Sequence, residues 1–423
     1  MNDHQKAGGR TPLETLAPAL EGWLNEGRPE ALDRWLSREL GEEGAPLRLG
    51  SSMWSDCLGR LLDARRERRR WPSSIDRRVL ALGRCLLRFS RPDGTQAADF
   101  SAEGDLAGRR SVFAELAQAY PGSGEARVIG WWLSLPDGPH VPPPLPAFSS
   151  TRRVLAVLRA GWREADDLLT IDQSREESSS RFELFGAGCS WLGPDWRLLD
   201  AASLTRPPSP GKWISSSAAD FAEWSFRLGD VRVTRAALLL RGQKTALLGD
   251  QIDGRSMLSE TVSALYSLPP DVVAKPMADC RGMLLRRPET KSAALALPLA
   301  LPALAYSTDR GQFGVAAAGG SLQYRLTPRG RRCWLPLLVT WDPKRRRKRV
   351  SWRVLTVAEN GRICGPDQAF AARVSWGRDD TLVIYRSLGP PALRSFLGHQ
   401  TRARFLIGRF TSEGLVEPLV SVG

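Results

Sequence analysis

Residues 151–254 consist of short apolar runs that are separated by glycine, aspartate, serine and proline. Apolar and polar residues alternate in part within these runs, which is typical of successive antiparallel strands. Two of the runs flank Arg241-Gly242-Gln243-Lys244, and this arrangement predicts a β-hairpin. The stretch therefore predicts the front half of an antiparallel β-sheet structure.

Similar strand patterns continue through residues 280–387 and return at the end of the chain. Together they predict roughly twelve to sixteen strands, which is too many for one small sandwich and indicates a large or doubled one. Residues 203–213, with three prolines, predict a loop, and residues 258–267 fit either a short helix or a strand.

The residues before position 134 show a different, helical periodicity. Thr11 and Pro12 provide a helix start, and Leu13, Leu16 and Leu20 follow at helical spacing. Further amphipathic segments follow at about 29–40, 52–70, 74–89, 110–120 and 126–133. Short amphipathic helices in series predict a helical domain, either a bundle or a toroid of helix pairs.

These patterns predict an α+β chain with two folded domains. We expect a disordered tail at residues 1–10, an α-helical domain at 11–133 and a β-sandwich domain at 151–423. Between the domains, residues 134–150 form a proline-rich stretch, which predicts a stiff extended linker because proline interrupts both helices and sheets.

The chain carries a formal net charge of +14 among its 423 residues. Such an excess favours a polyanionic partner, either an acidic polysaccharide, a nucleic acid or an anionic surface. GC-rich coding could also enrich arginine without any partner. The basic runs at 63–71 and 342–349 fit solvated segments as well as polyanion contacts, and the 15 tryptophans fit half-buried packing as well as a sugar-binding surface.

Several classes of protein are disfavoured. The chain contains no Walker A loop, no GxGxxG after a strand, no GxSxG elbow and no zinc-finger spacing, so we expect no cofactor and no metal. The six cysteines form no CxxC pair, which predicts free thiols. No signal-like or membrane-length apolar run is present, and we expect a cytoplasmic protein.

Four stretches occur in an order that resembles the heparinase II/III-like polysaccharide lyases: residues 87–94 (LRFSRPDG), 157–162 (VLRAGW), 180–184 (SRFEL) and 232–250. The resemblance covers roughly residues 80–260. It implies a truncated α/α toroid followed by a large antiparallel sandwich. It also implies a substrate class, the uronate-containing acidic polysaccharides, which such lyases cleave by β-elimination.

The family carries a His-x-His-x-Asp element, which includes a metal-linked or catalytic histidine, just before the third stretch. The matching positions here are Ser174, Glu176 and Ser178, and Thr234 occupies the place of a further histidine. This departure predicts a catalytically degenerate protein that binds an acidic polysaccharide. The alternatives are an active lyase and a basic nucleic-acid-binding protein.

Two sets of candidate site residues follow. An active lyase would need a base, an acid and a cation, and the candidates for base and acid are Tyr120, His140 and His399. The candidate ligand-binding residues are basic or aromatic side chains of the predicted sandwich: Arg159, Trp162, Arg181, Trp191, Trp196 and Arg235.

Overall fold

A computed structural model describes most of the chain. The described residues are 12–47, 53–67, 71–91, 95–97, 106–132, 147–163, 166–173, 178–199, 204–258 and 261–423. The predicted tail at 1–10 lies outside these ranges, as does most of the predicted linker. The chain divides into two compact units, unit 1 at Met1–Pro144 and unit 2 at Leu145–Gly423.

The described residues of unit 1 form six helices, close to the ranges that helical periodicity predicts. They are α1 (Pro12–Glu26), α2 (Glu30–Glu39), α3 (Trp54–Glu67), α4 (Ser73–Arg88), α5 (Leu106–Ala119) and α6 (Gly124–Trp132). In α2 the apolar stripe of Leu32, Trp35 and Leu36 is buried, because these residues recur on one face of the helix. The Trp54 and Phe89 rings add an edge-to-face contact at 4.9 Å.

Unit 2 is built from antiparallel strands in four sheets. The nine-stranded sheet contains β1 (Phe148–Ser149), β2 (Leu155–Arg159), β3 (Leu168–Gln173), β4 (Ser180–Gly186), β5 (Cys189–Leu192), β6 (Asp195–Leu199), β11 (Val262–Ser267), β15 (Gly311–Val315) and β16 (Ser321–Leu326). The eight-stranded sheet runs in the order β12 (Val273–Pro276), β13 (Met283–Arg287), β14 (Ser292–Pro298), β17 (Arg332–Thr340), β10 (Thr245–Asp253), β9 (Val231–Leu240), β8 (Ala219–Leu228) and β7 (Leu204–Ser215).

Two further sheets complete unit 2. The five-stranded sheet has the order β18 (Val350–Val354), β21 (Ala369–Trp376), β22 (Asp380–Ser387), β25 (Phe405–Phe410) and β26 (Val416–Val422). The four-stranded sheet has the order β20 (Arg362–Ile363), β19 (Ala358–Glu359), β23 (Arg394–Phe396) and β24 (His399–Thr401). A short helix, α7 (Pro343–Arg346), connects β17 to β18.

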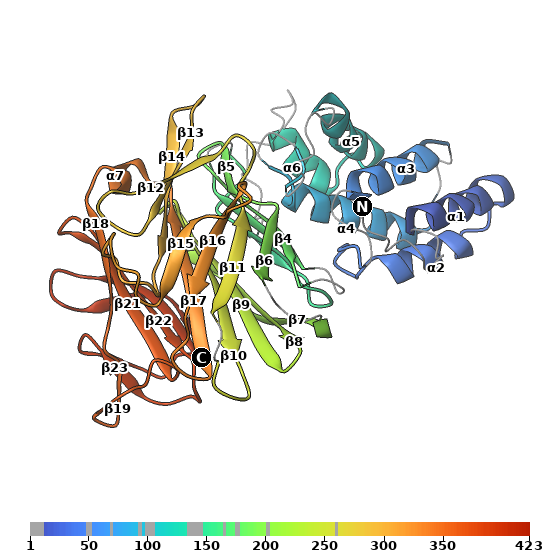
Figure 1. Ribbon diagram of the computed structural model, residues 1–423. Helices are drawn as coiled ribbons and strands as arrows, with labels where there is room; N and C mark the ends of the chain where they lie inside the picture. The colour runs from blue at the N-terminus through green and yellow to red at the C-terminus, as the bar shows by residue number, and fades with distance from the viewer. Residues whose placement is uncertain are drawn as a thin grey trace. The chain divides into compact units, whose positions relative to one another are not determined.

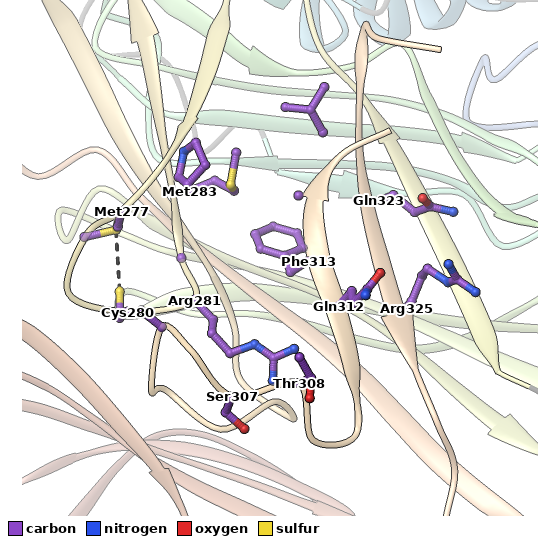
Figure 2. Close-up of a pocket in the computed structure, with 15 residues that line it drawn as sticks. Met277, Cys280, Arg281, Met283, Ser307, Thr308, Gln312, Phe313, Gln323 and Arg325 are labelled. Atoms are coloured by element: carbon purple, nitrogen blue, oxygen red, sulfur yellow. Dashed lines mark hydrogen bonds between the residues drawn. The ribbon is translucent and has the colours of Figure 1, made fainter. Parts of the chain in front are cut away.

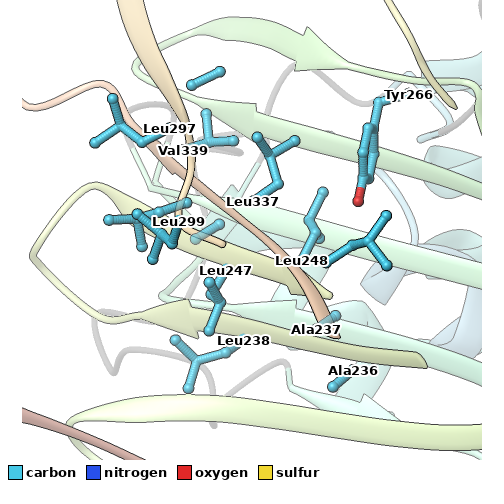
Figure 3. Packing of buried hydrophobic residues seen from close by; sticks show 14 of the residues in the cluster. Ala236, Ala237, Leu238, Leu247, Leu248, Tyr266, Leu297, Leu299, Leu337 and Val339 are labelled. Atoms are coloured by element: carbon cyan, nitrogen blue, oxygen red, sulfur yellow. The ribbon is translucent and has the colours of Figure 1, made fainter. Parts of the chain in front are cut away.

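The eight-stranded sheet is the central layer, because both of its faces are buried (Figure 1). On one face Arg235 contacts Trp196 of the nine-stranded sheet, and on the other Glu223 contacts Arg386 of the five-stranded sheet. Its middle strands β9, β10 and β17 are almost continuously apolar, as burial on two faces requires. Figure 3 shows leucines of these strands packed together in this core.

A second core joins the five-stranded and four-stranded sheets. Tyr385 of β22 stacks on Phe396 of β23 at a centroid distance of 5.1 Å, and Val383 and Leu406 are buried beside them. The prediction of an α+β chain with a large antiparallel β-structure is therefore confirmed, and the structure contains more layers than a single sandwich.

Two details differ from the sequence predictions. The described residues form 26 strands, more than the expected twelve to sixteen, because several strands have only two to four residues. Residues 204–215 form strand β7 in place of the expected loop. This strand is exposed and lies at the edge of its sheet, where proline is tolerated because no neighbour needs its missing N–H group.

Residues 262–267 form strand β11, which is one of the two alternatives that the sequence left open for this stretch. Within the described ranges, every helix is too short or too polar to traverse a lipid bilayer. The six cysteines are free thiols, and all except Cys364 are buried.

Candidate functional site

Two of the predicted ligand-binding residues, Trp196 and Arg235, lie in the core of unit 2. Both side chains are fully buried. Arg235 forms an ion pair of 2.7 Å with Asp250, and its guanidinium group lies 4.5 Å from the Trp196 ring centroid. The indole of Trp196 donates a hydrogen bond of 2.8 Å to the same carboxylate. The prediction of a ligand-binding role for this pair is wrong, because every polar group of the cluster is bonded inside the core.

Trp191, Arg159 and Trp162 are also buried. The Trp191 indole donates to the carbonyl oxygen of Gly186 at 3.1 Å. Arg159 donates to the carbonyl oxygen of Gly161 at 2.7 Å and lies 4.5 Å above the Trp162 ring, and burial lowers the pKa of Arg159 to about 9. These three residues therefore pack the sandwich and do not line its surface. Arg181 of β4 is half-buried, and its role stays a prediction.

Tyr120 lies in unit 1, directly after the last residue of α5, and is buried. Its hydroxyl donates a 2.8 Å hydrogen bond to Asp76, and the Arg65 guanidinium lies 4.4 Å from its ring centroid. Burial and the hydrogen bond to Asp76 both raise the pKa of Tyr120. A lyase base must lose its proton readily, and this environment disfavours the phenolate.

Of the two histidine candidates, His399 is the one that lies among the described residues. His399 lies on β24 of unit 2, where its ring packs 5.6 Å from Phe396, and it is half-buried. His140 lies outside the described residues, as do Ser174 and Glu176 of the substituted histidine element.

The other two positions compared with the lyase family, 178 and 234, lie among the residues that the structure describes. Ser178 is half-buried, and Thr234 is buried on β9. Ser178 stands where the lyase element has aspartate, and Thr234 stands where a further histidine is expected, so neither position carries the expected side chain. Over the described part of the chain, no three His, Cys, Asp or Glu side chains gather as metal ligands would.

A basic cleft that the sequence did not predict lies on the edge of the nine-stranded sheet, over β15 and β16. It consists of two adjoining hollows of about 340 and 410 Å³, which share Thr308, Gln312 and Arg325 as lining residues. We call it the arginine cleft, after the four arginines that line it: Arg281, Arg310, Arg325 and Arg329. Figure 2 shows the first hollow, with Arg281 and Arg325 contributed by different elements around Phe313.

The backbone between β14 and β15 positions the cleft. Arg281 donates a hydrogen bond of 3.0 Å to the carbonyl oxygen of Asp309 and a second one to that of Gly311, which fixes this connection beside β13. Gly311 has φ +134°, and a Cβ atom there would lie 2.0 Å from the carbonyl oxygen of Arg325. Glycine is therefore required for the close approach of β15 to β16 at the cleft.

The charges of the cleft are not compensated within the described residues. No carboxylate there forms an ion pair with any of the four arginines, and Asp309 is the single acidic residue of the lining. Burial, followed by the neighbouring charge of Arg329, lowers the pKa of Arg310. The Nε atom of Arg310 is buried and has no hydrogen-bond partner in the described part of the chain. An anion bound here would relieve the repulsion between Arg310 and Arg329.

Neutral side chains complete the lining. Thr308 and Gln312 are exposed, and the half-buried Phe313 rests against the buried Tyr324 ring at a centroid distance of 5.7 Å. Tyr306, which lies in the segment between β14 and β15, is 95% exposed. The cleft can therefore bind anionic groups through arginine and sugar hydroxyls through amides and threonines, while Phe313 offers a partly exposed apolar face.

A weak signal for part of this cleft is present in the sequence. Gln323, Arg325 and Thr327 alternate with apolar residues that are buried, so they share the outer face of one strand. Register then places Arg325 beside Gln312. Arg281 and Arg310 come from other segments of the chain, and no local pattern associates them with this face.

Comparisons with known proteins agree with this architecture. No protein-family model and no curated protein matches the chain. Among solved structures, the heparan sulfate lyase HepC from Pedobacter heparinus is 13% identical, with a TM-score of 0.64 over 91% of this chain and 67% of its own. The chain has a heparinase III-like fold. A heparinase III gene product gives a TM-score of 0.66 at 10% identity with the same coverage, and another heparinase III gives 0.61 at 12% identity over 85% of this chain and 62% of its own.

The likeness confirms the heparinase-like α+β fold that the four sequence stretches implied. The chain spans about two thirds of the length of HepC and of the heparinase III gene product. At this level of identity the likeness establishes the heparinase III-like fold alone, and the chemistry of the site must be argued from its side chains.

Proposed function

We propose that this protein binds an acidic polysaccharide in the arginine cleft and does not cleave it. The observation that carries the proposal is the set of four arginines that line one cleft with no ion pair to any carboxylate of the described residues. Arginine binds carboxylate and sulfate groups through a planar fork of donors, and among the described residues no carboxylate pairs with any of the four. The heparinase III-like fold favours a polysaccharide over other polyanions.

The absence of cleavage follows from the chemistry that β-elimination requires. A base must remove the proton beside the uronate carboxylate, and a cation must stabilise the charge that develops. Tyr120 is hydrogen-bonded to Asp76 with a raised pKa, and serine, glutamate and threonine occupy the positions of the expected histidines. The lining of the arginine cleft supplies cations but contains no histidine and no tyrosine.

The test is the binding of heparin and of chondroitin sulfate to the wild-type protein and to an Arg325→Ala/Arg329→Ala double variant. Both side chains are exposed and form no ion pair with the described residues, so the variant should fold normally. We expect at least a tenfold loss of affinity, and a shallower dependence of affinity on salt, because fewer counterions are released on binding. Arg409→Ala is the matched control, since Arg409 is an exposed arginine on β25, outside the cleft.

Two outcomes would contradict the proposal. Growth of ultraviolet absorbance from an unsaturated uronate product would show that the protein is an active lyase. Equal losses in the double variant and in the Arg409→Ala control would show that the net charge of +14, and no particular site, determines binding. A single-stranded DNA of similar length provides the third arm, and tighter binding of DNA than of either glycan would favour a nucleic-acid ligand.

A further inference from the structure

Strand β18 has an open backbone edge. It is the first strand of the five-stranded sheet and pairs only with β21. The amide of Gly377 donates to the carbonyl oxygen of Arg349 at 3.0 Å, and the amide of Leu355 donates to that of Ala371 at 2.8 Å. Since inward and outward groups alternate along an antiparallel strand, the backbone polar groups of Val350, Trp352 and Val354 point away from β21.

No backbone hydrogen bond from the described residues reaches these outward groups. They face a groove of about 860 Å³ that is lined on one side by β18 and on the other by residues of the segment 300–304. The Trp352 indole donates to the carbonyl oxygen of Leu301 at 2.8 Å, which holds this segment beside the strand. The groove is therefore a fixed feature of unit 2 and is bordered by an unpaired strand edge.

The walls of the groove are apolar and its rim is basic. Leu304 is 73% exposed and Val354 is 45% exposed, so both aliphatic side chains are accessible at the groove. Three arginines line the groove against one aspartate, Asp279. Of these arginines, Arg349 and Arg353 are exposed and belong to the strand itself or to its approach, and neither forms an ion pair with a described carboxylate.

We propose that β18 binds an extended acidic peptide segment of a partner protein, which adds to the five-stranded sheet as a further strand. Backbone hydrogen bonds to the outward groups of Val350, Trp352 and Val354 would supply affinity. Alternate apolar side chains of the peptide would cover Leu304 and Val354, and its carboxylates would meet Arg349 and Arg353.

A polysaccharide suits this groove less well than a peptide does. The donors and acceptors along β18 repeat at strand spacing, which a second strand matches and a chain of sugar rings does not. The proposal stands apart from glycan binding in the arginine cleft, because it rests on the β18 edge and not on β15 and β16. Arg310 lines both places and is therefore left unchanged in the test.

The test uses the full chain and a synthetic peptide of about seven residues that alternates glutamate with valine, long enough to match the five residues of β18. A peptide with lysine in place of glutamate is the charge control. We expect the acidic peptide to bind and the lysine peptide not to bind. Hydrogen exchange of the Trp352 and Val354 amides should slow by at least tenfold in the complex, since both amides become donors to the added strand.

Two variants, each with a matched control variant, test the contributions of the backbone and of the charge separately. Val354→Pro removes an outward N–H group without removing a bond to β21, and it should weaken peptide binding at least tenfold with an unchanged unfolding midpoint. Val354→Thr keeps the N–H group and should bind as the wild type does. Arg353→Glu should weaken the acidic peptide, whereas Arg347→Glu, at an exposed arginine that does not line the groove, should not.

The proposal is overturned if the edge amides keep their exchange rates in saturating acidic peptide, or if the lysine peptide binds equally well. It is also overturned if heparin, but no peptide, protects these amides, since the groove would then be a glycan site. Because the Arg325→Ala/Arg329→Ala variant leaves β18 intact, it should bind the acidic peptide normally, and failures of the two proposals remain distinguishable.

Discussion

The hydroxyl group of Tyr120 donates a hydrogen bond of 2.8 Å to the Asp76 carboxylate, which also forms an ion pair of 3.1 Å with Arg65. The two contacts connect α3, α4 and the end of α5 within unit 1. A tyrosine that the lyase hypothesis would use as a base is thus part of the packing of these helices.

Replacing Tyr120 by phenylalanine should lower the free energy of unfolding by about 1 kcal/mol, the usual contribution of one hydrogen bond. Affinity for heparin should not change, because Tyr120 does not line the arginine cleft. Chemical denaturation and glycan titration of the same preparation measure both quantities. Tyr306→Phe is the matched control, since Tyr306 is 95% exposed and its hydroxyl should contribute no measurable stability.

Substituting one member of the buried ion pair Arg235–Asp250 should lower the free energy of unfolding much more than Tyr120→Phe does. Arg235→Met leaves the Asp250 carboxylate with the Trp196 indole but without its cation, and we expect a loss of about 3 to 5 kcal/mol in the free energy of unfolding. The double variant Arg235→Met/Asp250→Leu should lose less than the single variant, since it buries no unpaired charge. A double variant as unstable as the sum of its parts would contradict this account.

The order of elements could be predicted from the sequence because it is encoded locally. Proline at position 12 and the helical spacing of Leu32, Trp35 and Leu36 mark helices whose partners lie nearby in the chain. The turn at residues 241–244 marks the hairpin of β9 and β10 in the same way. Such signals need no knowledge of distant contacts.

The burial of Trp196 and Arg235 could not be predicted, because it depends on three stacked sheets. A strand such as β9 loses its apolar alternation when both of its faces are buried, so the sequence does not indicate which polar side chain points inward. The arginine cleft was missed for a related reason. Arg281 and Arg325 lie 44 positions apart, and only the folding of β13, β15 and β16 brings them to one cleft.

The basic run at 342–349 contains both buried and exposed arginines, and the sequence does not distinguish them. Arg345 is buried, forms two hydrogen bonds of 2.8 and 2.9 Å to Asp380 and lies 4.3 Å from the Trp376 ring centroid. Arg345→Ala should therefore lower the free energy of unfolding by about 3 kcal/mol. Arg347→Ala, two positions away and exposed, should change it by less than about 0.5 kcal/mol. A loss of less than about 0.5 kcal/mol in both variants would show that the run acts only as a solvated loop.

Asp167 should make the folded protein less stable as pH rises, which is the opposite of the effect of a carboxyl group whose pKa is lowered on folding. Burial raises the pKa of this carboxyl group to about 7, although the Trp341 indole, which donates to it at 2.8 Å, opposes the shift. The folded state therefore holds a proton that the unfolded state has released, so Asp167 lowers the free energy of unfolding progressively as pH rises from about 4 to 7. Below that window the group is protonated in both states and contributes nothing.

Asp167→Asn removes the ionisable group and keeps an oxygen that can accept from Trp341. We expect the variant to match the wild type near pH 4 and to become more stable than it as pH rises, by up to roughly 4 kcal/mol above pH 7. Urea denaturation at a series of pH values measures the difference. Asp379→Asn, at an exposed aspartate of the β21–β22 turn, should shift the unfolding free energy by less than about 0.5 kcal/mol throughout. A constant difference between Asp167→Asn and the wild type from pH 4 to pH 8 would show that Asp167 is ionised in the folded protein across the whole range.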